Sequence, residues 1–375
     1  MADVTPTEAP WEFVPRNRER RANYREGFGV PELFSANGAP APGIVTTQDD
    51  FAVSWTRDDV GKKIEVLLRT SDEAEARNAF KLCTQDQWSY QEAKIALSLA
   101  EWRNLIEPIA YRPLDFRFTV YDSHVAVHLR DRVMRHVRRR NNVAMSLTKK
   151  IDEVRPFTDV FAFDQLIQHH SLSLKEVNYL FPLYLYPDST ELDQTRRVNF
   201  DPKLYAKLRA LAAHAKRGEP DEVAVFDYIY GVLHCPAYRE TYAEFLKIDF
   251  PRIPWPSSPA VFWDVSDKGG QLRRLHLMEP AAIGDTPYPF AGAGEGIVEK
   301  PVFRDGAVWI NAAQRFENAP EISWGFHIGG YQPAQKWLKD RKGRALDYAD
   351  VQHYQRILKI LSETDRIMKM IDMPL

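Results

Sequence analysis

The stretch that most constrains the fold runs from Phe226 to Trp255, FDYIYGVLHCPAYRETYAEFLKIDFPRIPW. Apolar and aromatic residues recur at helical spacing on both sides of Pro236, which indicates two amphipathic helices. Pro236 interrupts the pattern, and a Pro-Arg-Ile-Pro segment ends it, because proline cannot continue a helix. The sequence therefore predicts two short helices joined by a tight turn. We interpret the stretch as a core element without chemistry, since no partner appears for His234 or Cys235.

The chain has 375 residues, which is enough to bury a full core and allows two or three lobes. Its hydrophobic content of 44% is that of a folded protein. No apolar run approaches the roughly 18 residues of a membrane span, and the start lacks the pattern of a secretion signal. Cys83 and Cys235 are far apart, which excludes a disulfide framework and fits a reducing compartment. We therefore expect a cytoplasmic protein without a membrane partner.

Hydrophobic periodicity predicts a mixed α+β fold, rich in helices, with small β-sheets and a long C-terminal helix. Strands are expected around residues 51–55 and at 116–120, 142–147, 160–163, 178–187, 296–300 and 307–311. Helices are expected after Thr56, which would cap the first of them, and at 72–82, 90–104, 129–140, 201–216, 226–246, 262–276 and 347–372. Asp347 is the expected N-cap of the last helix.

Positive charge is concentrated in one segment, although the net charge of the chain is only −2. Residues 130–155 hold nine Lys/Arg against three acids, a balance of +6 that leaves −8 for the rest. On a helical wheel over 129–140, arginines gather opposite Leu129, Val133 and Val137. Such a face can neutralise phosphates, and arginine can bind guanine in the major groove. The candidate DNA-binding residues here are Arg130, Arg132, Arg135, Arg138, Arg139, Lys149, Lys150 and Arg155. A solvated basic face is the alternative.

A second basic stretch, KWLKDRKGR, lies near the C-terminus. Its candidate DNA-binding residues are Lys339, Arg341, Lys342 and Arg344. The Gly-Gly-Tyr-Gln segment before it is typical of a backbone turn, so we favour a structural role over DNA contact for this stretch.

A glycine-rich segment, PFAGAGEG from Pro289, resembles the loop that binds S-adenosylmethionine in amino-methyltransferases. Such a loop follows a buried strand, opens a helix and accompanies an Asp/Asn-Pro-Pro-aromatic motif. The chain contains no such motif, and a strand is expected after the glycines. We therefore interpret the segment as a flexible connection.

Two patterns that suggest metal sites are also incomplete. Glu92 and Lys94, with Asp86 upstream, match the end of a restriction-nuclease metal site, but a helix would point the two side chains apart. Two histidine pairs lack further ligands at workable spacing, namely His124 with His128 and His169 with His170. We expect no metal, no cofactor and no active site in this chain acting alone.

Six blocks of the chain resemble, in order, the C-terminal specificity domain of single-chain Type I-like (Type ISP) restriction-modification enzymes. They are YRPLDFRFTVYD from Tyr111, RDRVMRHV from Arg130, NYLFPLYLYP from Asn178, FDYIYGVLHCPAYRETYAEFLKIDFPRIP from Phe226, FHIGGYQPAQKWLKDRKGR from Phe326 and HYQRILKILSETDRIMKMID from His353. Leu114 stands where the family usually has phenylalanine. The blocks cover most of residues 100–372. We expect a specificity domain over 91–375 and an N-terminal segment over 1–90 that joins it or packs on it.

The resemblance implies a target-recognition domain that contacts double-stranded DNA so that an adenine methyltransferase can flip and modify its base. In the complete enzymes a nuclease, a translocase and the methyltransferase precede this domain. S-adenosylmethionine, ATP and Mg are therefore expected only on associated domains, in the same chain or another. Two alternatives remain open at this point. The chain could be a divergent methyltransferase fragment that binds S-adenosylmethionine near Gly292 and Gly294, or a scaffold that docks a methyltransferase without touching DNA.

Overall fold

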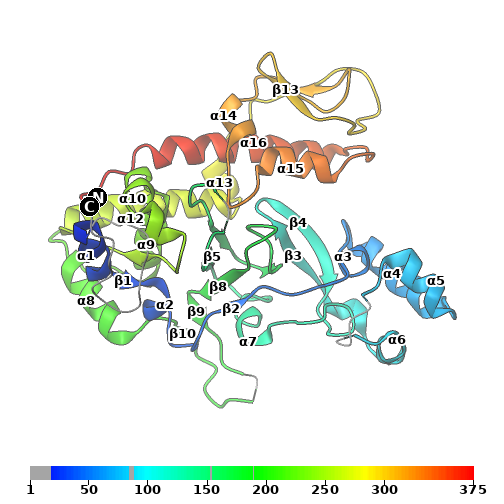
Figure 1. Cartoon of the computed structure of the whole chain (residues 1–375), viewed down its shortest axis with the longest axis horizontal. Helices are drawn as coiled ribbons and strands as arrows, with labels where there is room; N and C mark the ends of the chain where they lie inside the picture. The colour runs from blue at the N-terminus through cyan, green and yellow to red at the C-terminus, as the bar shows by residue number, and fades with distance from the viewer. Residues whose placement is uncertain (1–17, 84–87, 153, 189) are drawn as a thin grey trace, which may run out of the picture.

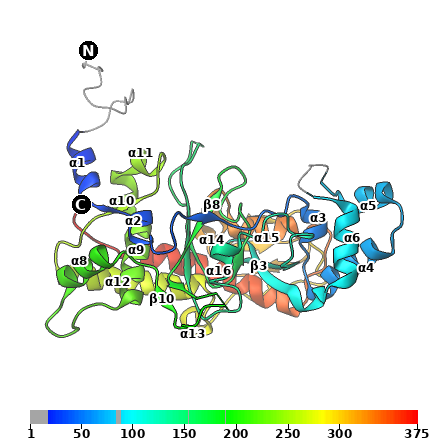
Figure 2. The ribbon, with the colours of Figure 1, turned by 90° about the horizontal axis from the view of Figure 1, so that it is seen from below.

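The computed structural model describes residues 18–83, 88–152, 154–188 and 190–375, and it confirms the mixed α+β class (Figure 1). Within these described ranges, two hydrophobic cores support the fold. The larger core is built mainly from residues beyond 109 and includes Tyr24–Ile44 of the N-terminal part. The smaller core runs from Phe51 to Val127. Figure 2 shows the helices of the smaller core at one end of the molecule. No helix in the described ranges is long and apolar enough to cross a membrane.

A four-stranded antiparallel sheet, in the order β2-β8-β5-β6, lies at the centre of the larger core. Its strands are β2 (Ala41–Pro42), β8 (Asn178–Pro182), β5 (Ala144–Thr148) and β6 (Val160–Phe163). All residues of β5 and β6 are buried, as the apolar runs predicted. A short pair extends this region, β9 (Tyr184–Leu185) with β10 (Arg197–Val198).

A three-stranded sheet, in the order β4-β3-β7, connects the two cores. Its strands are β3 (Ile106–Arg112), β4 (Asp115–Val120) and β7 (Leu166–Ile167). β3 and β4 form a long antiparallel hairpin, and β7 runs parallel to β3. At the hairpin turn Leu114 has a φ of +62°, a left-handed conformation that is strained for leucine.

Residues 222–246, which include the start of the aromatic stretch from Phe226, form three helices: α9 (Glu222–His234), α10 (Pro236–Thr241) and α11 (Ala243–Leu246). This confirms the helical pattern and the break at Pro236, whereas the second predicted helix is divided at Tyr242 into α10 and α11. The chain continues through β11 (Arg252–Ile253) into α12 (Pro259–His276), which packs against α9, while α8 (Pro202–Ala212) lies beside them (Figure 1). Every residue of α9 from Val225 onward is buried, so α9 is the centre of this layer.

The C-terminal region ends in α16 (Tyr348–Met368), and Asp347 caps it by accepting a hydrogen bond from the Asp350 backbone N–H, as predicted. Three helices lead to it: α13 (Pro280–Ile283), α14 (Glu321–Gly325) and α15 (Pro333–Asp340). A small antiparallel sheet projects beside α14 and packs on α16 through Phe316 and Tyr354 (Figure 1). Its strands, in spatial order, are β12 (Phe290–Ala291), β15 (Arg315–Phe316), β14 (Ala307–Trp309) and β13 (Val302–Arg304).

The N-terminal part packs on the rest of the chain. It begins with α1 (Arg18–Glu26), β1 (Phe28–Gly29), which pairs with β11, and α2 (Val30–Leu33). The smaller core then contains α3 (Asp49–Ala52), α4 (Arg57–Arg69), α5 (Glu73–Phe80), α6 (Tyr90–Leu99) and a 3-10 helix (Trp102–Leu105). Thr56 caps α4 as predicted. This core includes residues on both sides of residue 90, because α4 packs on both α6 and β4.

Three expectations from the sequence are wrong. The strand predicted around 51–55 is wrong at its start, where α3 buries Phe51 and Ala52, whereas Val53 is extended and Ser54 forms an antiparallel bridge with Phe118. The predicted helix at 129–140 is reduced to α7 (Asp131–Met134), because Arg130 and Arg139 take left-handed φ values of +54° and +53°. The first strand of the predicted C-terminal hairpin is β13 rather than 296–300, although the turn at residues 305–306 is where the sequence placed it.

A buried polar chain links α9, α12 and α16. The hydroxyl of Tyr230 accepts a hydrogen bond from the Ala162 backbone N–H at 3.0 Å and donates to Nδ1 of His276 at 2.5 Å. His276 Nε2 then donates to the Thr364 hydroxyl at 2.9 Å, and that hydroxyl donates to the carbonyl of Ile360. This arrangement requires the neutral tautomer of His276, and burial accordingly lowers its pKa to about 3.

We expect the free energy of unfolding to fall as the pH drops from 7 to 5. Burial also lowers the pKa of His136 to about 4, so that both histidines take up protons in the unfolded chain near their ordinary value of 6.5 before the folded chain can. Each such group contributes a slope of about 1.4 kcal/mol per pH unit below pH 6. Urea unfolding of the wild-type chain and of His276→Gln at several pH values tests this. The variant should have the smaller slope, and identical slopes would contradict the assignment.

Candidate nucleic-acid interface

Four arginines surround an open hollow between the larger core and the smaller one. The hollow has a volume of ≈ 400 Å³. Its lining residues are Arg57, Glu107, Pro108, Val137, Arg138, Arg139, Arg140, Asp164, Gln165 and Leu166. We call it the arginine hollow. Figure 1 shows α7, which precedes three of its arginines, between the β9–β10 connection and the helices α4 to α6.

The charge of the arginine hollow is not balanced by its acids. Glu107 is buried, and its Oε1 receives the Nε atoms of Arg138 at 2.8 Å and Arg139 at 2.7 Å, so one carboxylate serves two guanidinium groups. Within the described residues, Arg57 and Arg140 have no acidic partner. The guanidinium group of Arg57 lies 5.5 Å from the ring centre of Phe118, and that of Arg140 lies 4.8 Å from the ring centre of Tyr186. The lining contains four arginines and two acidic residues, Glu107 and Asp164. Its net positive charge therefore favours the binding of an anion.

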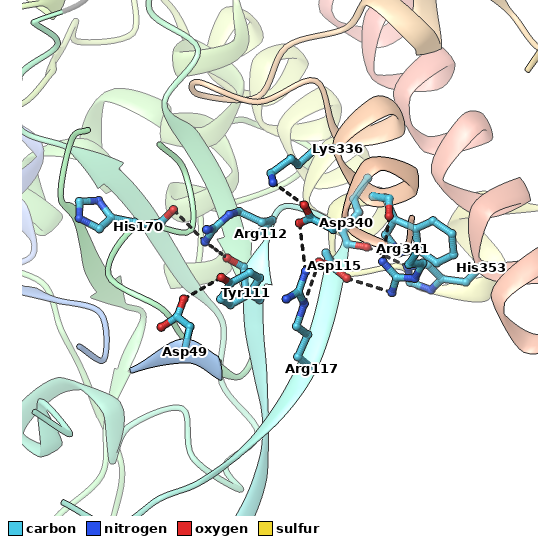
Figure 3. A network of polar contacts seen from close by, with 12 residues as sticks. Asp49, Tyr111, Arg112, Asp115, Arg117, His170, Lys336, Asp340, Arg341 and His353 are labelled. Carbon is cyan, nitrogen blue, oxygen red and sulfur yellow. Dashed lines mark hydrogen bonds and ion pairs between the residues drawn. The ribbon is translucent and has the colours of Figure 1, made fainter. Parts of the chain in front are cut away.

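Glu107 is held in place by the β3–β4 hairpin, whose other end docks on the C-terminal helices (Figure 3). There Asp115 accepts hydrogen bonds from Arg117, at 2.9 Å, and from Arg341, at 3.1 Å. Arg117 also bonds Asp340 of α15 at 3.0 Å. His353 Nε2 of α16 donates to the carbonyl of Leu114 at 2.8 Å. We call these contacts the hairpin anchor.

Aromatic rings complete the hairpin anchor. The indole of Trp55 lies against three guanidinium groups, those of Arg117 at 3.9 Å, Arg341 at 4.5 Å and Arg344 at 4.4 Å. Stacked cations of this kind stabilise the contact between distant segments. The anchor therefore fixes one end of β3 and orients Glu107 at the other end.

The structure brings only part of the predicted basic face together. Arg138 and Arg139 share Glu107, but Arg132 donates to the carbonyls of Asn37 and Ala39, and Arg135 pairs with Asp188 at 3.1 Å. Arg130 is exposed at the start of α7. The face is divided because the segment leaves the helical path after α7, so that successive arginines point to different neighbours.

The remaining predicted contacts lie elsewhere. Lys149 and Lys150 are exposed at the far end of β5, next to the segment of Lys247, whose carbonyl accepts the Ile151 N–H. Arg155 is largely buried and paired with Asp159 and Glu176. Lys339 and Lys342 are exposed around the end of α15, whereas Arg341 is only 5% exposed. Burial lowers the pKa of Arg341, which its bond to Asp115 opposes.

Sequence reasoning did not include Arg57, Arg140, Asp164 or Gln165 among the candidates. Arg140 belongs to the basic segment 130–155, so its charge could have identified it as a candidate from the sequence. The other three come from segments distant in sequence, α4 and the connection between β6 and β7, and only the fold brings them to one hollow.

The other motifs take structural places. Glu92 and Lys94 lie on α6, as expected, and Asp86 lies outside the described residues. The glycine-rich segment joins β12 to β13 and opens no helix. A Cβ at Gly292 would lie 2.1 Å from the carbonyl oxygen of Ala313, so this glycine allows two backbones to touch. Within the described ranges, no three His, Cys, Asp or Glu side chains are grouped to hold a metal.

Residues 35–370 match the Type ISP C-terminal specificity domain family, so the chain belongs to that family. This confirms the resemblance found in the sequence. A search of curated proteins found no match.

Solved structures share the fold. A cryo-EM structure of a DrdV–DNA complex superposes with a TM-score of 0.74 at 20% identity, covering 99% of this chain and 40% of the other. The Type ISP enzyme LlaBIII bound to DNA gives 0.71 at 16% identity, covering 96% and 24%. A nuclease-deletion mutant of the Type ISP enzyme LlaGI, with a DNA substrate mimic, gives 0.66 at 17%, covering 96% and 35%. The chain thus spans less than half the length of each of these relatives.

Proposed function

We propose that this chain recognises a specific sequence in double-stranded DNA for a restriction-modification or phage-defence enzyme, and that it is not catalytic by itself. The observation that carries the proposal is the arginine hollow in a fold of the Type ISP specificity family. Relatives of this fold have been solved with DNA, which supports the same ligand here. The glycine-rich segment does not favour the alternative of a methyltransferase fragment, because backbone packing accounts for Gly292.

We further propose that the catalytic steps belong to methyltransferase, translocase and nuclease domains of the same or another chain in the cytoplasm. S-adenosylmethionine, ATP and Mg would be bound there. The specificity domain would supply the sequence-dependent contacts that place an adenine for base flipping.

In this proposal the arginines of the hollow bind the phosphate backbone. Arg57 and Arg140 are the strongest candidates, since neither has an acidic partner within the described residues that a phosphate would have to displace. Arg138 and Arg139 add charge while Glu107 fixes their direction. We propose additional phosphate contacts from the exposed Arg130, Lys149, Lys150, Lys339 and Lys342, and a supporting structural role for Arg132, Arg135, Arg155, Arg341 and Arg344.

Replacing Arg57 and Arg140 together by alanine is expected to weaken duplex binding at least about tenfold for specific and random sequences alike. Each lost phosphate contact should also reduce the slope of log affinity against log salt by about 0.9. Titration of a labelled duplex by fluorescence anisotropy measures both quantities.

The matched control is Lys203→Ala with Lys216→Ala, which removes two exposed positive charges on and just after α8, outside the arginine hollow. The control should keep the wild-type salt slope. Equal losses in the two double variants would show that net charge, not the hollow, determines binding.

A further inference from the structure

A two-residue bend, Asp164–Gln165, lies in the lining of the arginine hollow and connects the two sheets. It leaves β6 of the central sheet and enters β7 of the three-stranded sheet. Phe163, just before the bend, pairs with Ala144, and Leu166, just after it, pairs with Ile109. The backbone is therefore fixed on both sides, as a precise recognition element requires.

The two side chains of the bend have no partner in another described residue. The carboxylate of Asp164 forms no ion pair there. Desolvation raises its pKa, its own backbone N–H opposes that shift, and the charge of Glu279 adds to it. The half-buried amide of Gln165 forms no hydrogen bond with a described residue. The neighbouring Arg138 and Arg139, by contrast, are both held by Glu107. The Asp164 carboxylate and the Gln165 amide therefore remain available to hydrogen-bond a ligand, next to arginines whose positions Glu107 fixes.

The negative charge of Asp164 limits which chemical groups of a ligand this side chain can contact. Asp164 would repel a phosphate, so it opposes backbone binding at the point where it lies. An acidic side chain in a DNA interface instead accepts a hydrogen bond from an exocyclic amino group, the N4 amino group of cytosine being the typical partner. Glutamine can bond N6 and N7 of adenine at once. Both groups are exposed in the major groove.

We propose that Asp164 and Gln165 read base edges in the major groove of the duplex whose phosphates the four arginines of the hollow hold. This inference rests on the proposed function and deepens it by naming specificity-determining residues. The arginines supply affinity that does not depend on sequence, whereas the bend contributes discrimination: Asp164 prefers cytosine and Gln165 prefers adenine.

The test is a selection from a pool of short duplexes with a randomised centre, using the full chain and sequencing what is bound. The variants are Asp164→Asn and Gln165→Ala. Asp164→Asn keeps the shape of the side chain but replaces one hydrogen-bond acceptor by a donor. The matched control is Gln91→Ala, on the exposed surface of α6 and outside the arginine hollow. Melting temperatures equal to that of the wild type establish that the variants are folded.

Each bend variant is expected to lose about tenfold discrimination at one or two positions of the enriched sequence, with affinity for random duplex retained. Gln91→Ala should reproduce the wild-type preference. If the wild type enriches a sequence that both bend variants keep unchanged, the reading role is wrong while the proposed function stands. If the wild type binds no duplex at all, the proposed function fails and the reading role fails with it.

Discussion

Asp115→Ala is expected to lower the free energy of unfolding by about 3 kcal/mol, because it removes the carboxylate shared by one buried and one largely buried guanidinium group. The Asp115 side chain is 3% exposed, and those of Arg117 and Arg341 are 12% and 6% exposed. Arg117 would keep Asp340. Among the described residues Arg341 would keep one acid, Asp350 at 3.7 Å, which is beyond hydrogen-bond distance, and the Trp337 carbonyl, to which it donates at 3.1 Å. Arg341 would then be a charge with no hydrogen-bonded acid in a buried position, where the desolvation cost is largest.

Urea unfolding followed by circular dichroism measures this loss. The matched control is Asp267→Ala, which breaks an ion pair with Arg217 whose side chains are 53% and 42% exposed, and which should cost less than about 1 kcal/mol. A loss no larger for Asp115→Ala than for the control would mean that the hairpin anchor does not stabilise the fold. Since the same hairpin carries Glu107, we also expect Asp115→Ala to weaken duplex binding.

Gly269→Ala is expected to cost about 3 kcal/mol as well, through overpacking between α9 and α12. A Cβ at Gly269 would lie 1.9 Å from the carbonyl oxygen of Asp227 and 2.8 Å from the backbone nitrogen of Gly231. Both atoms belong to the backbone of α9, so no side-chain rotation relieves the clash and the helices must separate. Gly231 faces the same crossing, since its Cβ would meet the Val265 carbonyl oxygen at 2.5 Å.

Gly325→Ala is the matched control, because this glycine also lies in a helix, α14, and an added Cβ meets no atom within 4 Å. It should be neutral or stabilise by up to about 1 kcal/mol. The comparison is made from unfolding midpoints and slopes in urea. Equal midpoints for Gly269→Ala and wild type would contradict the close contact of α9 with α12.

Long helices and apolar strands were predictable because their periodicity is local and is reinforced by caps. The C-terminal helix has both an apolar stripe and the Asp347 cap, and β5 and β6 are short fully buried runs. The segment after Leu129 has a helical pattern too, yet the fold bends it at Arg139, where Asn142 bonds the carbonyls of His136 and Tyr184. Tertiary hydrogen bonds of this kind cannot be predicted from the spacing of apolar residues.

The candidate site was predictable only in outline. A local charge of +6 marked the segment that supplies Arg138, Arg139 and Arg140. Charge alone could not distinguish these from Arg155, which lies inside an ion-pair network with Asp159. Asp164 and Gln165 carry no positive charge, so the sequence alone did not mark them as candidates. They became candidates because the fold places them in the same hollow as the arginines.

The central claim is that this chain binds duplex DNA with a sequence preference through the arginine hollow. The most direct measurement is the affinity of the wild-type chain for its selected duplex and for random duplex over a salt series. We predict that log affinity falls linearly with log salt for both duplexes, and that the selected one binds more tightly by a factor on the order of 10³ or more. Absence of duplex binding, or binding that salt does not change, would contradict the claim.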